Sequence, residues 1–324
     1  MTRWGVVGCG WVAREFFVPA LRAAGHELSA ACDPDAGRAR ALGPSGPAGP
    51  DLGELLSACE AVYVATPNHA HHDTVLACAA ASRDVLCEKP MALSLAAARE
   101  MVEACRIAGV RYATAHNQRY HPAHRRLRNL ARAGTLGQVT QARVLYACTA
   151  PAWWNDADWH FDPERAGGGA VADLAPHGID LIGWLCDTLP ERAVALPQRA
   201  VLHEHPVEDG GVLAVAYDGE LIASVQVAYH HAETLPRRVL ELIGTDGMAR
   251  ATDTMGQDAG GRLELFQARD GQRRAVSFDE TLDPFAAQID AFLAGQAADD
   301  ERDLAVIAVL EPVLDALRDA GALV

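Results

Sequence analysis

The stretch "GVVGCGWVA", Gly5 to Ala13, decides the fold of the first part of the chain. An apolar run ends in a glycine-rich turn and passes directly into a helical segment, which indicates a strand, a tight turn and a helix. Gly8 permits the turn, Gly10 lets the main chain approach a pyrophosphate, and Ala13 is small enough for close helix packing. The amino end of the helix favours an anion, so we expect a dinucleotide at this turn. The alternative is a glycine-rich turn of another α/β fold.

An acidic residue, Asp33, closes the next predicted strand. A carboxylate at that place accepts hydrogen bonds from both ribose hydroxyls and repels a 2′-phosphate. NAD is therefore the expected cofactor, in preference to NADP.

Short apolar runs alternate with helical stretches from residue 4 to residue 117, as in "AVYVATP" followed by "HHDTVLACAAAS". This rhythm predicts a doubly wound parallel sheet in a first domain, residues 1–119. Beyond it, Asp218-Gly219 and Asp246-Gly247 separate alternating apolar runs, which predicts two hairpins. We expect a second α/β domain, residues 120–324, with a large, mainly antiparallel sheet, whose closing helix can pack back on the first domain.

The charge is placed unevenly. The formal net charge is −15; residues 1–119 contribute −1 and residues 120–324 contribute −14. An acidic second half repels phosphate backbones, so no nucleic-acid partner is expected. No apolar run is long enough to span a membrane, and no signal-peptide pattern is present, so no membrane partner is expected. Eight scattered cysteines without a C-x-x-C pair indicate buried thiols in a reducing cytoplasm.

Polar residues follow two of the predicted parallel strands, where ligands bind in open sheets. "ATPNHAHHD" brings Thr66, Pro67 and Asn68 to the cofactor edge, and its histidines form a polar lining. A metal site is not expected there, because the histidines lack helical spacing and accompanying carboxylates. "CEKP" brings Lys89 to the same edge. Lys89 is the only lysine of the chain, and its ammonium could stabilise a developing alkoxide.

"GGGAVADLAPHGIDLIGWL" holds Asp173 and His177 four residues apart on one predicted helix face. A histidine with a carboxylate partner accepts a proton near neutral pH. The alternative is a helix-capping Asp and an ordinary, partly buried His.

The chain resembles the glucose–fructose oxidoreductase / inositol dehydrogenase (Gfo/Idh/MocA) family over nearly its whole length. The resemblance is carried by five motifs in the family's order: "GCGWVA", "ATPNHAHH", "CEKPMA", "HNQRYHP" and "GGGAVADLAPHGID". The resemblance implies a Rossmann domain, a second domain whose sheet forms a homodimer or homotetramer, and a small sugar or cyclitol substrate. It implies that Lys89 holds the substrate hydroxyl, that His177 is the general base and that Asp173 orients it. The expected cofactor-binding residues are Gly8, Gly10, Trp11, Val12, Asp33, Thr66, Pro67, Asn68, His71, Glu88, Lys89 and Asn117. The expected substrate-binding residues are Lys89, Tyr120, Trp154, Asn155, His160, Asp173 and His177.

Two segments depart from or add to the family pattern. Ala175-Pro176 stands where the family often has a glycine, which keeps the spacing of the Asp173–His177 pair. "APAWWNDADWHF", residues 150–161, is an aromatic and acidic loop. It forms either a wall against a sugar face or an oligomer contact.

These residues predict an NAD-dependent dehydrogenase that oxidises a secondary alcohol of a sugar, amino sugar or cyclitol, or reduces the ketone. One alternative is an enzyme that uses NAD transiently to cleave glycosides without net redox change. The other is a non-catalytic protein that senses a sugar or dinucleotide. An amino-sugar or aminocyclitol substrate is suggested by the acidic second half.

Overall fold

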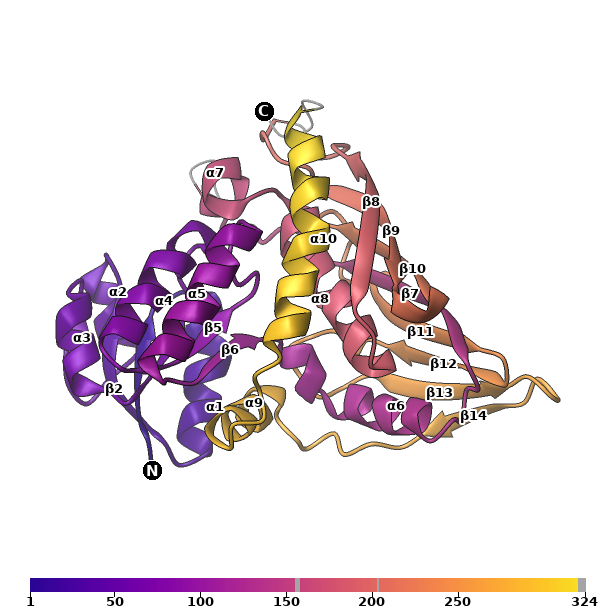
Figure 1. The fold of residues 1–324 in the computed structure, drawn as a ribbon, viewed down its shortest axis with the longest axis horizontal. Helices are drawn as coiled ribbons and strands as arrows, with labels where there is room; N and C mark the ends of the chain where they lie inside the picture. Colours follow the sequence, from indigo (N-terminus) through magenta and orange to yellow (C-terminus); the bar gives the residue numbers. More distant parts are fainter. Residues whose placement is uncertain (155–157, 203, 320–324) are drawn as a thin grey trace. The chain divides into compact units, whose positions relative to one another are not determined.

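The structure, a computed structural model, describes residues 1–154, 158–202 and 204–319. Its contacts divide the chain into two compact units (Figure 1). The first, which we call the parallel-sheet unit, consists of Met1–Ala115 and Phe285–Leu304. The second, the mixed-sheet unit, consists of His116–Pro284 and the chain from Ala305 on.

The parallel-sheet unit is built on six strands in the order β3-β2-β1-β4-β5-β6. Every neighbouring pair is parallel. This is the strand order of a doubly wound dinucleotide-binding sheet, and it confirms the fold expected for the first part of the chain. The strands are β1 (Arg3–Val7), β2 (Glu27–Cys32), β3 (Ala48–Gly49), β4 (Ala61–Val64), β5 (Asp84–Glu88) and β6 (Tyr112–Ala115).

Local side chains set the helix ends of this unit. Asp35, Asp51 and Ser94 each accept a main-chain N–H from the helix that follows. The longest of these helices ends at Gly109, whose φ of 67° is left-handed. The helical elements are a π-helical turn (Ala13–Phe17) that continues as α1 (Val18–Ala23), then α2 (Ala36–Ala41), α3 (Leu52–Ala58), α4 (His71–Ala80), α5 (Leu95–Ala108) and α9 (Pro284–Leu293).

An aromatic cluster forms the centre of the parallel-sheet unit. Phe17 stacks on Tyr63 with ring centroids 3.7 Å apart. Trp4 contacts both Phe17 and Phe292 with centroids at 5.5 Å. The cluster joins β1 and β4 to the first helical segment and to α9, so a helix far from β1 in the sequence contributes to the core of the first sheet.

The mixed-sheet unit is built on eight strands in the order β14-β13-β12-β11-β7-β10-β9-β8. All neighbouring pairs are antiparallel except β7 and β10, which run parallel. Both expected Asp-Gly hairpins are confirmed, between β9 and β10 and between β11 and β12. The strands are β7 (Val139–Ala147), β8 (Pro190–Gln198), β9 (Gly210–Tyr217), β10 (Ile222–Ala228), β11 (Arg238–Gly244), β12 (Gly247–Thr252), β13 (Arg262–Gln267) and β14 (Arg273–Val276).

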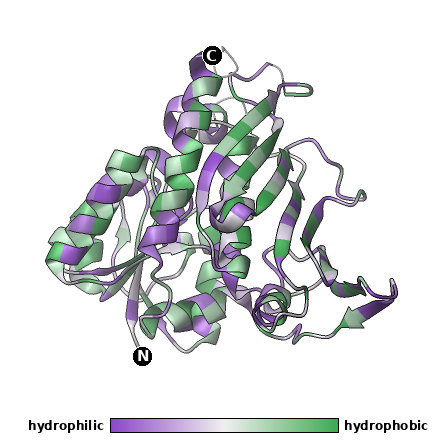
Figure 2. Cartoon of the chain, turned by 45° about the vertical axis from the view of Figure 1, so that its right-hand side comes forward, coloured by the Kyte–Doolittle hydropathy of each residue, from purple (hydrophilic) through white to green (hydrophobic). Residues whose placement is uncertain are grey.

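Helix α8 (Ala170–Cys186) is the central helix of this unit, and most of its residues are buried. A β-carbon on Gly178 would lie 3.1 Å from Val144 and from Val225, so the glycine lets α8 lie close on β7 and β10. Figure 2 shows hydrophobic and hydrophilic bands alternating along the strands, as expected for a sheet with one buried face. The other helices are α6 (Pro122–Arg132), α7 (Pro163–Ala166) and α10 (Asp300–Asp319). The later turns of α10 pack into the hydrophobic core of this unit.

All eight cysteines are free thiols. Among the described residues, none of the helices has the length and apolar character needed to cross a bilayer.

Candidate active site

The turn after β1 has the geometry that a dinucleotide needs. Gly8 has a φ of +88°, and a β-carbon there would lie 2.3 Å from the carbonyl oxygen of Ala65. Only glycine therefore fits between the ends of β1 and β4. A β-carbon on Gly10 would meet nothing within 4 Å, so space is open in front of the turn. The helical segment begins at Trp11 and buries Ala13 completely, so the predicted anion site has both its turn and its helix end.

Asp33 lies at the end of β2, directly beside this turn. Its carboxylate accepts the N–H of Cys9 at 2.9 Å and the N–H of Asp35 at 2.9 Å. Each carboxylate oxygen keeps further acceptor capacity for a hydroxyl. The residues present therefore fit a ribose at this place.

The loop after β4 lies beside the turn because Gly8 packs on Ala65 and Thr66. The side-chain oxygen of Thr66 is buried without a hydrogen-bond partner among the described residues, which fits a polar group supplied by a ligand. Pro67 is half-buried, and Asn68 is buried at the start of a 3₁₀ turn. Trp11 is exposed and packs edge-on against Phe16, while Val12 is half-buried.

His71, which is expected to bind the cofactor, lies inside the protein. It is fully buried, and its ring nitrogens lie 2.9 Å from the carbonyl oxygen of Pro90 and 3.0 Å from that of Thr66. Burial lowers its pKa to about 4. The imidazole therefore joins the loops that follow β4 and β5 from inside the protein.

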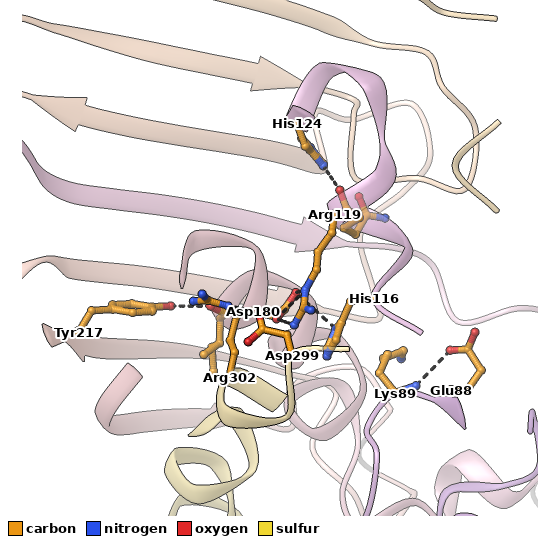
Figure 3. Close-up of polar contacts among 11 residues, drawn as sticks. Glu88, Lys89, His116, Arg119, His124, Asp180, Tyr217, Asp299 and Arg302 are labelled. Carbon is orange, nitrogen blue, oxygen red and sulfur yellow. Dashed lines mark hydrogen bonds and ion pairs between the residues drawn. The ribbon is translucent and has the colours of Figure 1, made fainter. Parts of the chain in front are cut away.

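Glu88 and Lys89 stand at the carboxyl end of β5, as the sequence predicts (Figure 3). The Tyr63 hydroxyl donates to Glu88 at 2.5 Å, and the main-chain N–H of Lys89 donates to the same carboxylate at 3.2 Å. Burial, followed by the charge of Glu88, holds the pKa of Tyr63 well above its usual value, so the hydroxyl remains a donor. Glu88 is thus fixed between the sheet and the Lys89 main chain.

In the mixed-sheet unit, Asp173 and His177 lie on one face of α8, which continues without a break through Pro176. The Tyr229 hydroxyl donates to the Asp173 carboxylate at 2.8 Å. Burial, followed by the charge of Asp173, raises the pKa of Tyr229 well above its usual value. His177 is 8% exposed, and its ring meets Tyr146 edge-on at 5.2 Å. The pair thus has a fixed carboxylate and a buried imidazole with some access.

Asp180 lies on α8 three residues after His177 and holds the segment that begins at His116 (Figure 3). It forms a two-pronged, buried ion pair with Arg119, with Nε 2.9 Å from Oδ2. His116 Nδ1 lies 3.5 Å from the same carboxylate. Asn117 is buried and Tyr120 half-buried on the 3₁₀ turn that carries Arg119. The Arg119–Asp180 ion pair therefore holds the turn that carries Asn117 and Tyr120 against α8.

The aromatic loop, residues 150–161, lies next to the Asp173–His177 pair through a contact with Tyr229. Trp154 contacts Tyr229 edge-on at 5.4 Å and stacks on His160 at 3.8 Å. His160 Nδ1 lies 2.5 Å from Asp158. Burial raises the pKa of Asp158, but hydrogen bonds from the His160 side chain and main chain outweigh it and lower the pKa overall. Asn155, also expected to contact substrate, lies outside the described residues.

Sequence reasoning missed the residues that hold these groups in place. Tyr63 and Tyr229 appear in the sequence as ordinary strand residues, and nothing local shows that their hydroxyls meet Glu88 and Asp173. Arg119 lies inside the motif "HNQRYHP", but its partner Asp180 is 61 residues away. The only local signal was an arginine inside a polar motif.

Comparison with known proteins agrees with this geometry. The family model "Oxidoreductase family, NAD-binding Rossmann fold" matches residues 2–116, and the model "GFO/IDH/MocA C-terminal domain" matches residues 124–250. The chain is 34% identical over 275 residues to 1,5-anhydro-D-fructose reductase of Ensifer adhaerens, covering 83% of this chain and 81% of that protein. It is 29% identical over 299 residues to D-xylose 1-dehydrogenase (NADP(+)) 2 of Haloferax volcanii, covering 89% and 87%.

Among solved structures, the aldose-aldose oxidoreductase from Caulobacter crescentus has the same fold. It superposes with a TM-score of 0.86 over 98% of both chains at 20% identity. With an NAD(P)-binding Rossmann domain, a matching second domain and relatives named as sugar oxidoreductases, the chain is an oxidoreductase that belongs to the Gfo/Idh/MocA family.

Proposed function

We propose that the protein is an NAD-dependent dehydrogenase that oxidises a secondary alcohol of a sugar, amino sugar or cyclitol, or reduces the corresponding ketone. The observation that carries the proposal is the face of α8, where Tyr229 fixes Asp173 one helical turn from His177. A fixed carboxylate one helical turn from an imidazole that keeps 8% exposure suits a general base. The helix-cap alternative for Asp173 is disfavoured because the N-cap residue of α8 is Gly169, four residues earlier.

The proposed chemistry divides between the two units. His177 takes the proton of the substrate hydroxyl, and Asp173 orients its imidazole. The Lys89 ammonium stabilises the oxygen as negative charge develops on it. The dinucleotide, when bound, supplies the hydride acceptor. The Gly8 turn, Asp33 and Thr66 hold that dinucleotide, and the proposal requires Lys89 and His177 to act on one hydroxyl.

NAD is proposed in preference to NADP because Asp33 is anchored beside the Gly8 turn by two main-chain N–H groups. A carboxylate held in this way cannot easily turn away from a 2′-phosphate, which it would repel. One relative is named for NADP and the matching family model for NAD, and we expect the choice in this chain to depend on Asp33.

The test is a panel of neutral sugars, amino sugars and inositols, each supplied with NAD and with NADP and followed by absorbance of the reduced cofactor. Steady accumulation of reduced NAD with at least one sugar or cyclitol supports the proposal. Cleavage of a glycoside without such accumulation would show that the cofactor is used only transiently. Binding of a sugar without any turnover would show a sensor instead.

The substrate's charge is tested in the same panel. Residues 120–324 carry a balance of −14, which would attract a cationic sugar at low salt. If so, kcat/KM for amino sugars exceeds that for the neutral sugars and falls as ionic strength rises. Equal values without salt dependence would leave neutral sugars as the substrate class.

We also propose that two copies of the chain pair through the open face of the mixed sheet. Leu196 on β8 is paired with Val212 on β9, and Val194 is paired with Ala214 on the same face. By register Ile222 on β10 also belongs to this face, and all four large residues are exposed, Leu196 by 78%. An apolar stripe of this kind marks an interaction surface. Sedimentation of the wild type and of L196E tests the proposal, which fails if both are monomers.

A further inference from the structure

Glu208 lies at the start of α8, next to the turn that carries Asp173. It is fully buried, and its two carboxylate oxygens accept the N–H groups of Gly169 at 2.9 Å and Val171 at 2.8 Å. Its main-chain oxygen accepts the N–H of Ala170 at 3.0 Å. One residue from a distant segment therefore satisfies three successive N–H groups that the first turn of a helix leaves unpaired.

The glycines before α8 allow this contact. A β-carbon on Gly169 would lie 2.0 Å from the Glu208 main-chain oxygen. Gly168 has a φ of +156°, and a β-carbon there would lie 2.9 Å from Ala172. The run of glycines in "GGGAVAD" is thus explained by the close approach of Glu208.

Glu208 is a buried acid whose carboxylate is held by main-chain N–H groups. Among the described residues no cation acts on its pKa, which burial raises even though the N–H groups of Gly169, Val171 and Ala172 act to lower it. A buried carboxyl group without a cation destabilises a fold unless it is well hydrogen-bonded. Its hydrogen bonds to the main chain at the start of α8 point to a role in positioning the helix.

The next residue, Asp209, supports Asp173 from a second direction. Its carboxylate accepts the N–H groups of Val201 at 2.6 Å and Leu202 at 2.7 Å. Its main-chain oxygen accepts the N–H of Tyr229 at 2.8 Å. Tyr229 in turn donates its hydroxyl to Asp173. The two consecutive acids therefore hold both the helix turn that carries Asp173 and the tyrosine that binds its carboxylate.

We infer that Glu208, together with Asp209, is a positioning residue for Asp173. Glu208 fixes the first turn of α8 and Asp209 fixes the main chain of Tyr229, and together they set where the Asp173 carboxylate stands. The inference rests on the proposed function, in which Asp173 orients the general base. Glu208 itself has no contact with substrate or cofactor in this role.

The experiment is a double-mutant cycle with Glu208→Gln and Asp173→Asn. Gln keeps the shape of Glu208 but offers one acceptor oxygen, so one N–H of α8 loses its partner. In the otherwise wild-type enzyme we expect E208Q to lower kcat by about 10- to 100-fold, the effect of a small misplacement of a catalytic group. NADH binding, measured by fluorescence, should stay unchanged, because the Gly8 turn belongs to the other unit. In the D173N background, E208Q should lower kcat no further.

The outcomes separate the inference from the function on which it rests. If D173N alone turns over like the wild type, the proposed function is wrong. If D173N is impaired and E208Q lowers kcat by the same factor in both backgrounds, Glu208 acts by general destabilisation and the inference is overturned. Should E208Q fold poorly, Y229F replaces it in the cycle, because it removes only the hydroxyl that binds the Asp173 carboxylate. If Y229F and D173N lower kcat additively, the inference is overturned as well.

Glu241→Gln is the matched control. Glu241 is a buried carboxylate of β11 that pairs with Arg250 at 2.7 Å, in the same unit and away from α8. We expect E241Q to lower the melting temperature and leave kcat unchanged. A loss of kcat equal to that of E208Q would also overturn the inference.

Discussion

The two units hold their candidate residues in different ways. In the parallel-sheet unit Asp33, Thr66 and Lys89 follow strand ends, and main-chain groups do most of the positioning. In the mixed-sheet unit Asp173 and His177 lie on a helix whose place depends on buried side chains from distant segments, as in the Arg119–Asp180 pair. Topology alone sets a strand end, whereas a helix face needs specific partners. Substitutions of buried polar groups should therefore disturb the second unit more.

The largest expected effect concerns Arg119→Met. The substitution leaves Asp180 buried and without its guanidinium partner, which should lower the free energy of unfolding by about 3–5 kcal/mol. Arg132→Met is the control, because Arg132 pairs with the exposed Asp187; its cost should stay below about 1 kcal/mol. Urea unfolding measures both. Equal costs would break the comparison, since the buried pair would then be no more important than a surface pair.

Lys89→Ala tests the chemistry assigned to the parallel-sheet unit. Loss of a donor to a developing oxyanion should lower kcat by about 10²- to 10³-fold. The unfolding free energy and NADH binding should change little, because main-chain groups shape this edge. Arg99→Ala, which removes an exposed cation from α5, serves as the control and should leave kcat unchanged. Normal turnover by K89A would remove Lys89 from the mechanism.

The pKa of His71 gives the parallel-sheet unit a defined acid sensitivity. The folded-state pKa is about 4, below the usual 6.5, so the unfolded chain binds the proton more readily. The stability due to the neutral imidazole is complete above about pH 6.5 and is lost as the pH falls towards 4, by about 3 kcal/mol in full. Urea unfolding of H71Q at about pH 7.5 and about pH 5 should show a weaker pH dependence of the unfolding free energy than that of the wild type. H69Q, which alters an exposed neighbour, is the control. If H69Q weakened the pH dependence of the unfolding free energy as much as H71Q, the role assigned to His71 would be contradicted.

The smallest expected effect is a change of cofactor preference in Asp33→Ser. Removing the carboxylate removes repulsion of a 2′-phosphate, so the ratio of kcat/KM with NAD to that with NADP should fall by about 10- to 100-fold. Asp51→Ser, which keeps the cap of α3, should leave the ratio unchanged. An unchanged ratio in D33S would assign cofactor choice to other residues.

The sequence predicted the parallel-sheet unit well because its signals are local. The strand, turn and helix around Gly8 and the acid at Asp33 need no information from elsewhere in the chain. The hairpins at Asp218-Gly219 and Asp246-Gly247 were equally local, and both are confirmed. The family resemblance, carried by several short motifs in order, is confirmed as well.

The parts that were missed depend on distant contacts. Strand β8 contains Pro190 and Pro197, which weaken a strand signal and are tolerated because β8 is an edge strand. The parallel pairing of β7 with β10 cannot be read from alternation, which is the same for either direction. Glu208 resembles any surface acid in the sequence, although it is fully buried against α8.

The solitary lysine at the end of β5 makes this enzyme unusually easy to observe. Reductive methylation with isotope-labelled formaldehyde would label the ε-amine of Lys89, the only lysine side chain in the sequence. A carbon NMR spectrum would then hold one lysine side-chain resonance, which should shift if cofactor or sugar binds beside Lys89. Because every other Lys/Arg position of the chain is an arginine, the Lys89 resonance would report on the proposed active site alone.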